Sequence, residues 1–409
     1  MNSVKHLFLT LGLVLISVIT PSPVSATWSQ PSQSWLQKFR DAPPRFSDGM
    51  VSTAWGGIWR IEQSLQNKFY IPMVETHYPS NYFKKSRIKV FEVLRKTTVR
   101  QVEEVAMAPL IVYLPGIFGR GNSGGGSKTA YDYYARGYHV LIVPNPISTD
   151  YLGDRPSYKF GDLTTDGDVV IEAIKNFIAK NKKVKWVELV SESYGSYFSL
   201  VVLNRDVERL IRRTTLVSPP IDLVNSMDNF DRFFDESDEE YHSICAGKKQ
   251  FSHFVWDMIT GAQDSDLDSS TSRCAKPIVS WWSFHRKMIQ TAELLRSQSR
   301  GEGYHFSDQE RRDYRFSHFS KEFTPDQPQG DPEIRKLGTL EYWISQLPSD
   351  QQNRVRIIAS EDDPINERVD WDGLEARYLD SSNFIKLPWG GHVGFIMLNE
   401  YQSLLDINF

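Results

Sequence analysis

The chain has 409 residues, of which 13% are aromatic, and a formal net charge of −4 at pH 7. Basic residues occur singly or in pairs along this nearly neutral chain, which excludes the basic surface that nucleic-acid binding requires. The length exceeds what one hydrophobic core usually organises, so we expect two domains or one domain with a large insertion.

Residues 1–26 have the pattern of an export signal. A short polar start precedes a mostly apolar run, Leu7–Thr20, and Val24-Ser25-Ala26 supplies the small residues of a cleavage site. A transmembrane anchor is the alternative, but the apolar run is short for a bilayer span and prolines follow it. We therefore expect cleavage near Ala26 and a mature chain that is periplasmic or secreted, with no integral membrane segment.

The first strands are expected after an irregular N-terminal lead-in. Residues 27–67 are rich in Trp, Ser, Pro and Gly without a clear period, and have room for one short helix. Lys68–Tyr78 and Ser86–Arg95 then alternate polar and apolar residues and contain β-branched or aromatic side chains. They predict an antiparallel hairpin that opens the sheet of a first core segment, residues 68–220.

Beyond the hairpin, continuously apolar runs alternate with helical patterns. The apolar runs are Leu110–Leu114, His139–Pro144, Val184–Val190 and Thr215–Ser218, and the helical patterns are Thr129–Arg136 and Asp168–Lys183. Strands that are apolar on both faces are typical of a parallel sheet covered by helices. The sequence therefore predicts an α/β fold with a mostly parallel, doubly wound sheet.

The alternation stops over residues 221–353, which are rich in acids, aromatics and helix formers. Arg354–Ala359 and Asn383–Leu387 resume the strand pattern, so residues 354–409 form the second part of the same core. Ligands bind at the carboxyl edge of such sheets. We therefore expect the insertion to be a large, mainly helical cap over that edge.

The chain contains two cysteines, Cys245 and Cys274. In an exported protein, an even number of cysteines most often forms disulfides, and we expect these two to pair. Zinc is the alternative, because His242 and His253 are near in sequence, but this spacing is poor support for a metal site.

A glycine-rich segment, Gly119–Thr129, has the composition of a phosphate-binding loop but not its pattern. That loop needs glycine immediately before Lys128 and again five residues earlier, where this chain has Ser127 and Asn122. We expect a mobile loop instead.

Ser191-Glu192-Ser193-Tyr194-Gly195 joins a predicted strand to a predicted helix. A serine on such a sharp turn projects its hydroxyl above the sheet, and the turn needs small residues two places before and after it. Ser193 meets this requirement with Ser191 and Gly195. The usual pattern has glycine at both flanking places, so Ser191 is a departure.

A nucleophilic serine needs a base to remove its proton and an acid to orient that base. Asp362 and Asp363 follow the strand that ends at Ser360, and His392 follows the next strand in a glycine-rich loop. We expect Asp363 to be the acid; Asp362 is the nearest alternative, and Asp222 a more distant one.

With this order of Ser, Asp and His, the chain resembles the α/β-hydrolase superfamily from Lys68 to its end, apart from the insertion. Gly390-Gly391-His392-Val393-Gly394-Phe395 looks most like the serine esterases and lipases whose final motif is Gly-Gly-His-x-Gly-Phe. Asp363-Pro364 matches the acid turn of the superfamily. Leu114–Gly119 occupies the place of its His-Gly oxyanion motif, with Pro115 in place of the histidine. By that resemblance, Ile117 and Tyr194 would offer backbone N–H groups to the oxyanion.

These features predict an exported serine hydrolase that cleaves carboxylic esters, of small molecules or lipids, through Ser193, Asp363 and His392. The chemistry requires no metal and no organic cofactor. A catalytically inactive binding protein of the same fold, and a thioesterase, amidase or peptidase with the same triad, are the alternatives. The aromatic residues Trp281, Trp282 and Phe284 either pack the cap or line an acyl site. Oligomeric state has no signature in the sequence.

Overall fold

The computed structural model describes most of the chain from residue 48 onward. The described residues are 48–56, 71–99, 101–121, 124–206, 208–240, 274–275, 279, 284–300, 303–323, 336–366, 371–378, 383–397 and 401. Several sequence predictions lie outside them: the export signal, most of the lead-in, Cys245, His242, His253, Trp281 and Trp282. Cys274 is buried, and its pairing with Cys245 stays a prediction.

Eight strands form one sheet in the order β1-β2-β6-β5-β7-β8-β9-β10. They are β1 (Val74–Pro79), β2 (Arg87–Val93), β5 (Ala108–Leu114), β6 (His139–Ile142), β7 (Val184–Glu192), β8 (Ile211–Val217), β9 (Val355–Ser360) and β10 (Phe384–Leu387). Strand β2 pairs antiparallel with β1 and with β6, and every other neighbouring pair is parallel. The predicted mostly parallel sheet, opened by an antiparallel hairpin, is confirmed.

The central strand β5 shows why both faces of the sheet must be covered. Leu110, Val112 and Leu114 belong to one hydrophobic core, while Ile111 and Tyr113 belong to a second core on the opposite face. None of the five is more than 2% exposed. Burying a side chain of this size contributes about 1.5–3 kcal/mol relative to leaving it exposed, so helices on both faces stabilise the strand.

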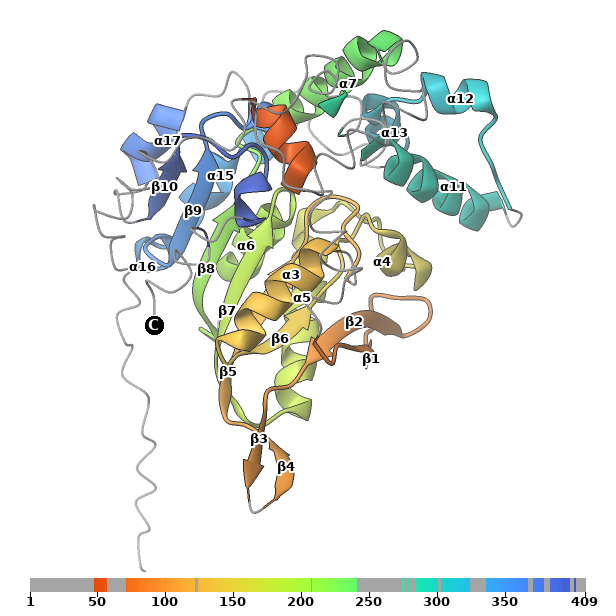
Figure 1. The fold of residues 1–409 in the computed structure, drawn as a ribbon. Coiled ribbons are helices and arrows are strands. Elements are labelled where there is room, and N and C mark those ends of the chain that lie inside the picture. Colours follow the sequence, from red (N-terminus) through yellow and green to blue (C-terminus); the bar gives the residue numbers. More distant parts are fainter. Residues whose placement is uncertain are drawn as a thin grey trace, which may run out of the picture.

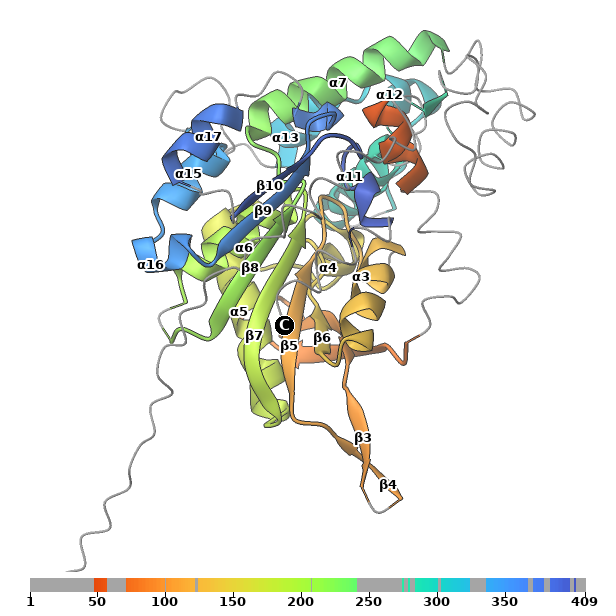
Figure 2. The same cartoon turned by 60° about the vertical axis from the view of Figure 1, so that its left-hand side comes forward.

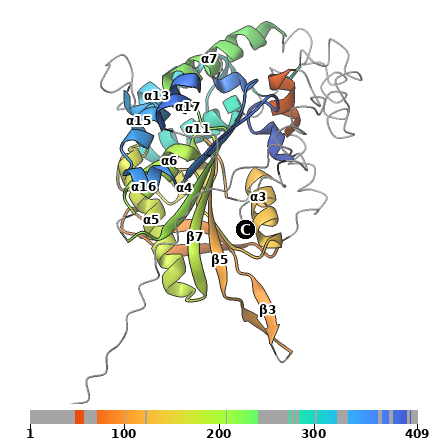
Figure 3. The ribbon, with the colours of Figure 1, turned by 90° about the vertical axis from the view of Figure 1, so that its left-hand side faces the viewer.

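Figure 3 shows helix α3 (Gly124–Ala135) on one side of the sheet and helices α5 (Leu163–Lys180) and α6 (Gly195–Asn204) on the other. Helix α3 begins earlier than the predicted Thr129. Gly124–Gly126 therefore form the first turn of a helix, and the prediction of a mobile loop is wrong at these positions. Ala130 and the three tyrosines of this helix pack in the second core, which favours the helix over an open loop.

Four helices of the insertion lie over the carboxyl ends of the strands in Figures 1 and 2. They are α7 (Leu223–Glu240), α11 (Arg286–Arg300), α12 (Asp308–Asp313) and α13 (Phe316–Phe323). Helix α15 (Leu340–Ser345) instead contacts α6 and α17 (Trp371–Tyr378), beside the sheet.

Several short elements connect these helices and strands. They are α4 (Thr149–Gly153), α16 (Ser349–Gln352), the 3₁₀ turns η4 (Pro364–Asn366) and η5 (Gly394–Met397), and a small hairpin of β3 (Lys96–Val99) and β4 (Val102–Val105). The hairpin projects from the end of the sheet opposite the insertion (Figure 1). None of the helices within the described ranges has the length and hydropathy that a membrane crossing needs.

The lead-in contributes one described helix, residues 49–56. It begins after Asp48, whose carboxylate accepts the backbone N–H groups of Met50 at 2.7 Å and Val51 at 3.1 Å. Such a capping aspartate satisfies N–H groups that have no partner inside the helix. In Figure 1 this helix, coloured red, lies at the carboxyl edge of the sheet, and its last residue, Gly56, lies close to Gly394 of η5.

Candidate active site

Ser193 occupies a tight turn between β7 and α6. Its backbone has φ +51°, a conformation that few non-glycine residues adopt, and its N–H donates to the carbonyl of Val217 on the neighbouring strand at 2.9 Å. A side chain on Gly195 would place its Cβ 2.3 Å from the carbonyl oxygen of Leu114. The strained serine backbone and the compulsory glycine are the features of a nucleophile elbow.

The departure from the usual elbow pattern, Ser191, is accommodated beneath the turn. Its side chain is fully buried, and its hydroxyl donates to the carbonyl of Thr215 at 3.4 Å and lies 3.5 Å from the hydroxyl of Ser196. The extra atoms therefore fill a polar niche between β7 and β8.

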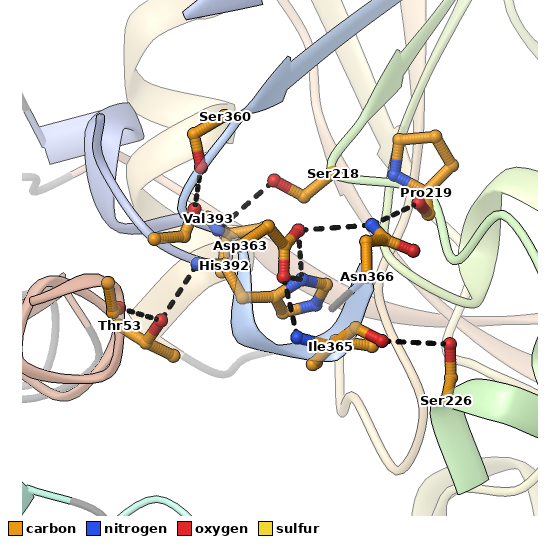
Figure 4. Close-up of polar contacts among 12 residues, drawn as sticks. Thr53, Ser218, Pro219, Ser226, Ser360, Asp363, Ile365, Asn366, His392 and Val393 are labelled. Carbon is orange, nitrogen blue, oxygen red and sulfur yellow. Dashed lines mark hydrogen bonds and ion pairs between the residues drawn. The ribbon is translucent and has the colours of Figure 1, made fainter. Parts of the chain in front are cut away.

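His392 and Asp363 form a buried pair at the carboxyl edge of the sheet (Figure 4). Nδ1 of the imidazole lies 2.9 Å and 3.1 Å from the two carboxylate oxygens, and the residues are 6% and 3% exposed. The backbone N–H of Ile365 and the side-chain amide of Asn366 also donate to this carboxylate, at 2.9 Å and 3.2 Å. An N–H on Nδ1 that donates to Asp363 leaves Nε2 as the basic nitrogen.

The carboxylates of the two alternative acids, Asp362 and Asp222, accept hydrogen bonds from other groups. Asp362 accepts the backbone N–H groups of Gly390 at 3.2 Å and Gly391 at 2.8 Å, on the loop that leads to His392. Asp222 accepts two N–H groups in the first turn of α7, at 2.8 Å and 3.1 Å. The structure therefore brings Asp363, rather than either alternative, to the imidazole.

Adjacent residues at the end of β8 connect the elbow with the histidine loop. Val217 accepts the N–H of Ser193, and the hydroxyl of Ser218 accepts the N–H of Val393 at 3.2 Å (Figure 4). Within the described residues, no hydrogen bond joins Ser193 to His392 directly. Catalytic hydrogen bonds are often long before substrate binds, and tighten in the reacting complex.

The predicted oxyanion residues, Ile117 and Tyr194, line one pocket together with Ser193. Ile117 belongs to the loop after β5, and Tyr194 directly follows the serine. The side-chain amide of Asn145 donates to the carbonyl of Pro115 at 3.1 Å, and the backbone N–H of Asn145 donates to Gly119 at 3.1 Å. Asn145 therefore braces the loop that carries Ile117.

The wall of this pocket is mostly apolar and comes largely from the insertion. Phe230 of α7 stacks on Phe284 with ring centroids 4.0 Å apart, and Phe316 and Phe319 of α13 also line the pocket. The remaining lining residues are Ile117, Ile147, Ser193, Tyr194, Pro220, Leu223, Ser226, Met227 and Ile365. Of the three aromatics considered from the sequence, Phe284 lines this pocket.

Sequence reasoning missed three supports of the site. Asn366 donates to Asp363, the Ser218 hydroxyl accepts from the histidine loop, and the Thr53 hydroxyl accepts the N–H of His392 at 2.7 Å. Asn366 had a usable signal, because it lies one turn after Asp363. Thr53 had none, since it is far from His392 in sequence. Among the described residues, no group of three or more His, Cys, Asp or Glu is arranged to hold a metal ion.

The sequence matches no known family model and no curated protein. Among solved structures, an acylaminoacyl peptidase of Pyrococcus horikoshii is 12% identical, with a TM-score of 0.44 over 84% of this chain and 42% of that chain. This chain thus spans less than half of the peptidase. An esterase of Pyrococcus furiosus is 10% identical, with a TM-score of 0.44 over 84% and 92% of the two chains. A thermostable carboxyl esterase of Bacillus coagulans is 10% identical, with a TM-score of 0.41 over 78% and 89%.

Proposed function

We propose that this chain, whose sheet and elbow have the arrangement of the α/β-hydrolase fold, is a serine hydrolase of carboxylic esters. The observation that carries the proposal is the buried hydrogen bond between Asp363 and His392, at the same sheet edge as the strained Ser193. Burying a carboxylate is costly unless it is paired and hydrogen-bonded. Here the carboxylate of Asp363 fixes the imidazole through Nδ1, which leaves Nε2 as the basic nitrogen that a serine hydrolase requires.

In the proposed reaction, the hydroxyl of Ser193 attacks the ester carbonyl while Nε2 of His392 takes its proton. The backbone N–H groups of Ile117 and Tyr194 bind the oxyanion. Each donor is expected to raise kcat by roughly 10²- to 10³-fold. The intermediate collapses as His392 returns the proton to the leaving alcohol. Water then attacks the acyl-serine with the same base, which releases the carboxylic acid and restores the hydroxyl.

The acyl group of the proposed substrate is apolar. Beside Ser193, the pocket presents aromatic and aliphatic side chains from α7, α13 and Phe284. Such a wall favours a hydrocarbon or aromatic acyl group over a charged or strongly hydrated one. Esters of small molecules and of lipids both carry such a group. We also propose that the enzyme is exported, because of the signal pattern in residues 1–26.

Labelling with a fluorophosphonate probe tests the proposed nucleophile. Wild-type protein should be labelled on Ser193, and Ser193→Ala should not be labelled. Ser199→Ala is the matched control, because Ser199 lies buried on α6 and its hydroxyl makes no hydrogen bond within the described residues. Labelling that is absent from wild type, or that survives Ser193→Ala, contradicts the assignment.

A panel of chromogenic esters with increasing acyl length then defines the substrate class. One methylene in an apolar pocket changes the transition-state free energy by about 1–3 kcal/mol at most, or roughly 10- to 200-fold in rate, so the rate should depend clearly on acyl length. Faster cleavage of matched thioesters or anilides than of oxyesters would assign the thioesterase or amidase alternative instead.

A further inference from the structure

The helix at residues 49–56 lies against the loop that carries His392, although more than 300 residues separate them in sequence. Thr53 makes the central contact. Its hydroxyl accepts the backbone N–H of His392 at 2.7 Å and donates to the carbonyl of Gly49 at 2.7 Å (Figure 4). The second bond fixes the direction of the hydroxyl hydrogen, so that a lone pair faces His392.

The contact is backbone against backbone on both sides of the histidine. Gly391 has φ +62°, and a Cβ there would lie 2.2 Å from the carbonyl oxygen of Gly49. A Cβ on Gly394 would lie 2.4 Å from the carbonyl oxygen of Ser52. The residue immediately before His392, and the one two places after it, therefore leave room only for the helix backbone.

We propose that Thr53 is a positioning residue for the catalytic base, an inference that rests on the function proposed above. Asp363 holds the imidazole ring, and Thr53 holds the main chain from which the ring projects. Together they fix both ends of the His392 side chain relative to Ser193. The helix at residues 49–56 is thus part of the active-site frame.

The rate should depend on this bond because the base must lie within hydrogen-bond reach of the serine hydroxyl. Without the acceptor, the N–H of His392 is left unpaired in a part-buried place, and the loop is expected to shift toward another partner. A displacement of about 1 Å in a catalytic group can lower a rate by roughly 100-fold. The apolar pocket is built by other residues, so substrate affinity should change little.

The test compares Thr53→Val, which keeps the shape but removes the hydroxyl, with Thr53→Ser, which keeps the hydroxyl. Thr53→Val should lower kcat roughly tenfold or more, with KM changed less than about twofold, and Thr53→Ser should restore most of kcat. Thr76→Val is the matched control, since its hydroxyl donates to Glu92 at 3.1 Å on β1, away from the site.

Amide hydrogen exchange of His392 gives a second readout that needs no activity. Its exchange should accelerate in Thr53→Val, and stay slow in Thr53→Ser and Thr76→Val. A folded Thr53→Val with wild-type kcat, or a kcat that Thr53→Ser does not restore, overturns the inference and leaves the serine hydrolase standing. If wild type cleaves no ester, the proposed function fails, and unchanged exchange at His392 in Thr53→Val would then overturn the positioning contact as well.

Discussion

Ser193 and His392 lie at the same edge of one sheet, yet the chain holds them there in different ways. The turn at Ser193 is fixed by the strands beside it, through the N–H bond to Val217 and the close approach of Gly195 to Leu114. The loop at His392 is fixed by Thr53 from the N-terminal helix and by Asp362. The geometry of the proposed nucleophile therefore follows from the sheet, whereas that of the proposed base depends in addition on distant packing.

The largest effect should come from the bond that links the base to its acid. Asp363→Asn should lower kcat by roughly 10⁴-fold while the protein stays folded, because an amide facing Nδ1 favours the wrong tautomer of His392. Steady-state hydrolysis of a chromogenic ester measures the change. Asp362→Asn is the matched variant and should keep most of the activity. The reverse ranking would make Asp362 the acid and overturn the assigned pair.

Gly391→Ala should break the distant packing of the base without touching the elbow. The added methyl group would lie 2.2 Å from the carbonyl oxygen of Gly49, and φ is +62°. We expect kcat/KM to fall roughly 100-fold and the melting temperature to fall as well. Gly303→Ala, at a position with nothing within 4 Å of its Cβ, is the control. Wild-type kinetics in Gly391→Ala would show that the helix does not constrain the base.

The free energy of unfolding, measured at several pH values, tests how Asp362 holds the loop that carries His392. Burial raises the pKa of this carboxyl above its ordinary value, against the opposing effect of the Gly391 and Gly390 N–H groups. A raised folded-state pKa means that the folded protein binds the proton more tightly. The stabilisation is therefore full below the unfolded pKa of about 4 and is lost as pH rises through the folded pKa.

The free energy of unfolding, wild type minus Asp362→Asn, should accordingly decrease as pH rises from about 4. Urea titrations at several pH values measure this difference. A difference that increases with pH would mean that the two backbone N–H groups outweigh burial, so that the loop is held by an ionised carboxylate.

The smallest effect on activity is expected from a substitution of Ser191, which lies beneath the elbow. Ser191→Gly restores the usual pattern and removes one hydrogen bond, so the free energy of unfolding should fall by about 0.5–1.5 kcal/mol. The value of kcat should stay within about twofold, because the niche accommodates the hydroxyl without altering the turn. A tenfold gain in kcat would show instead that Ser191 distorts the nucleophile.

The sequence predicted those parts of the site that depend on local pattern. The run Leu110–Leu114 predicted a central strand, and the strand-to-helix junction at Ser193 predicted the elbow. Because parallel strands end at one edge, Asp363 and His392 could be expected near each other. The contact of Thr53 with His392 could not be predicted, since it depends on how the lead-in packs on a distant loop. The start of α3 could not be predicted because Gly124–Gly126 carry no helical periodicity, whereas Ala130 and Tyr133 later in the same helix are buried in the core.

A double-substitution cycle tests most directly whether Ser193, which the sheet positions, and His392, which also depends on the N-terminal helix, act as one catalytic unit. Hydrolysis rates would be measured for Ser193→Ala, His392→Ala and the double variant, each verified as folded. The account predicts that each single substitution lowers kcat by roughly 10⁶-fold, and that the double variant is no slower than either one. Losses that multiply in the double variant, or a His392→Ala enzyme that keeps most of its activity, would contradict it.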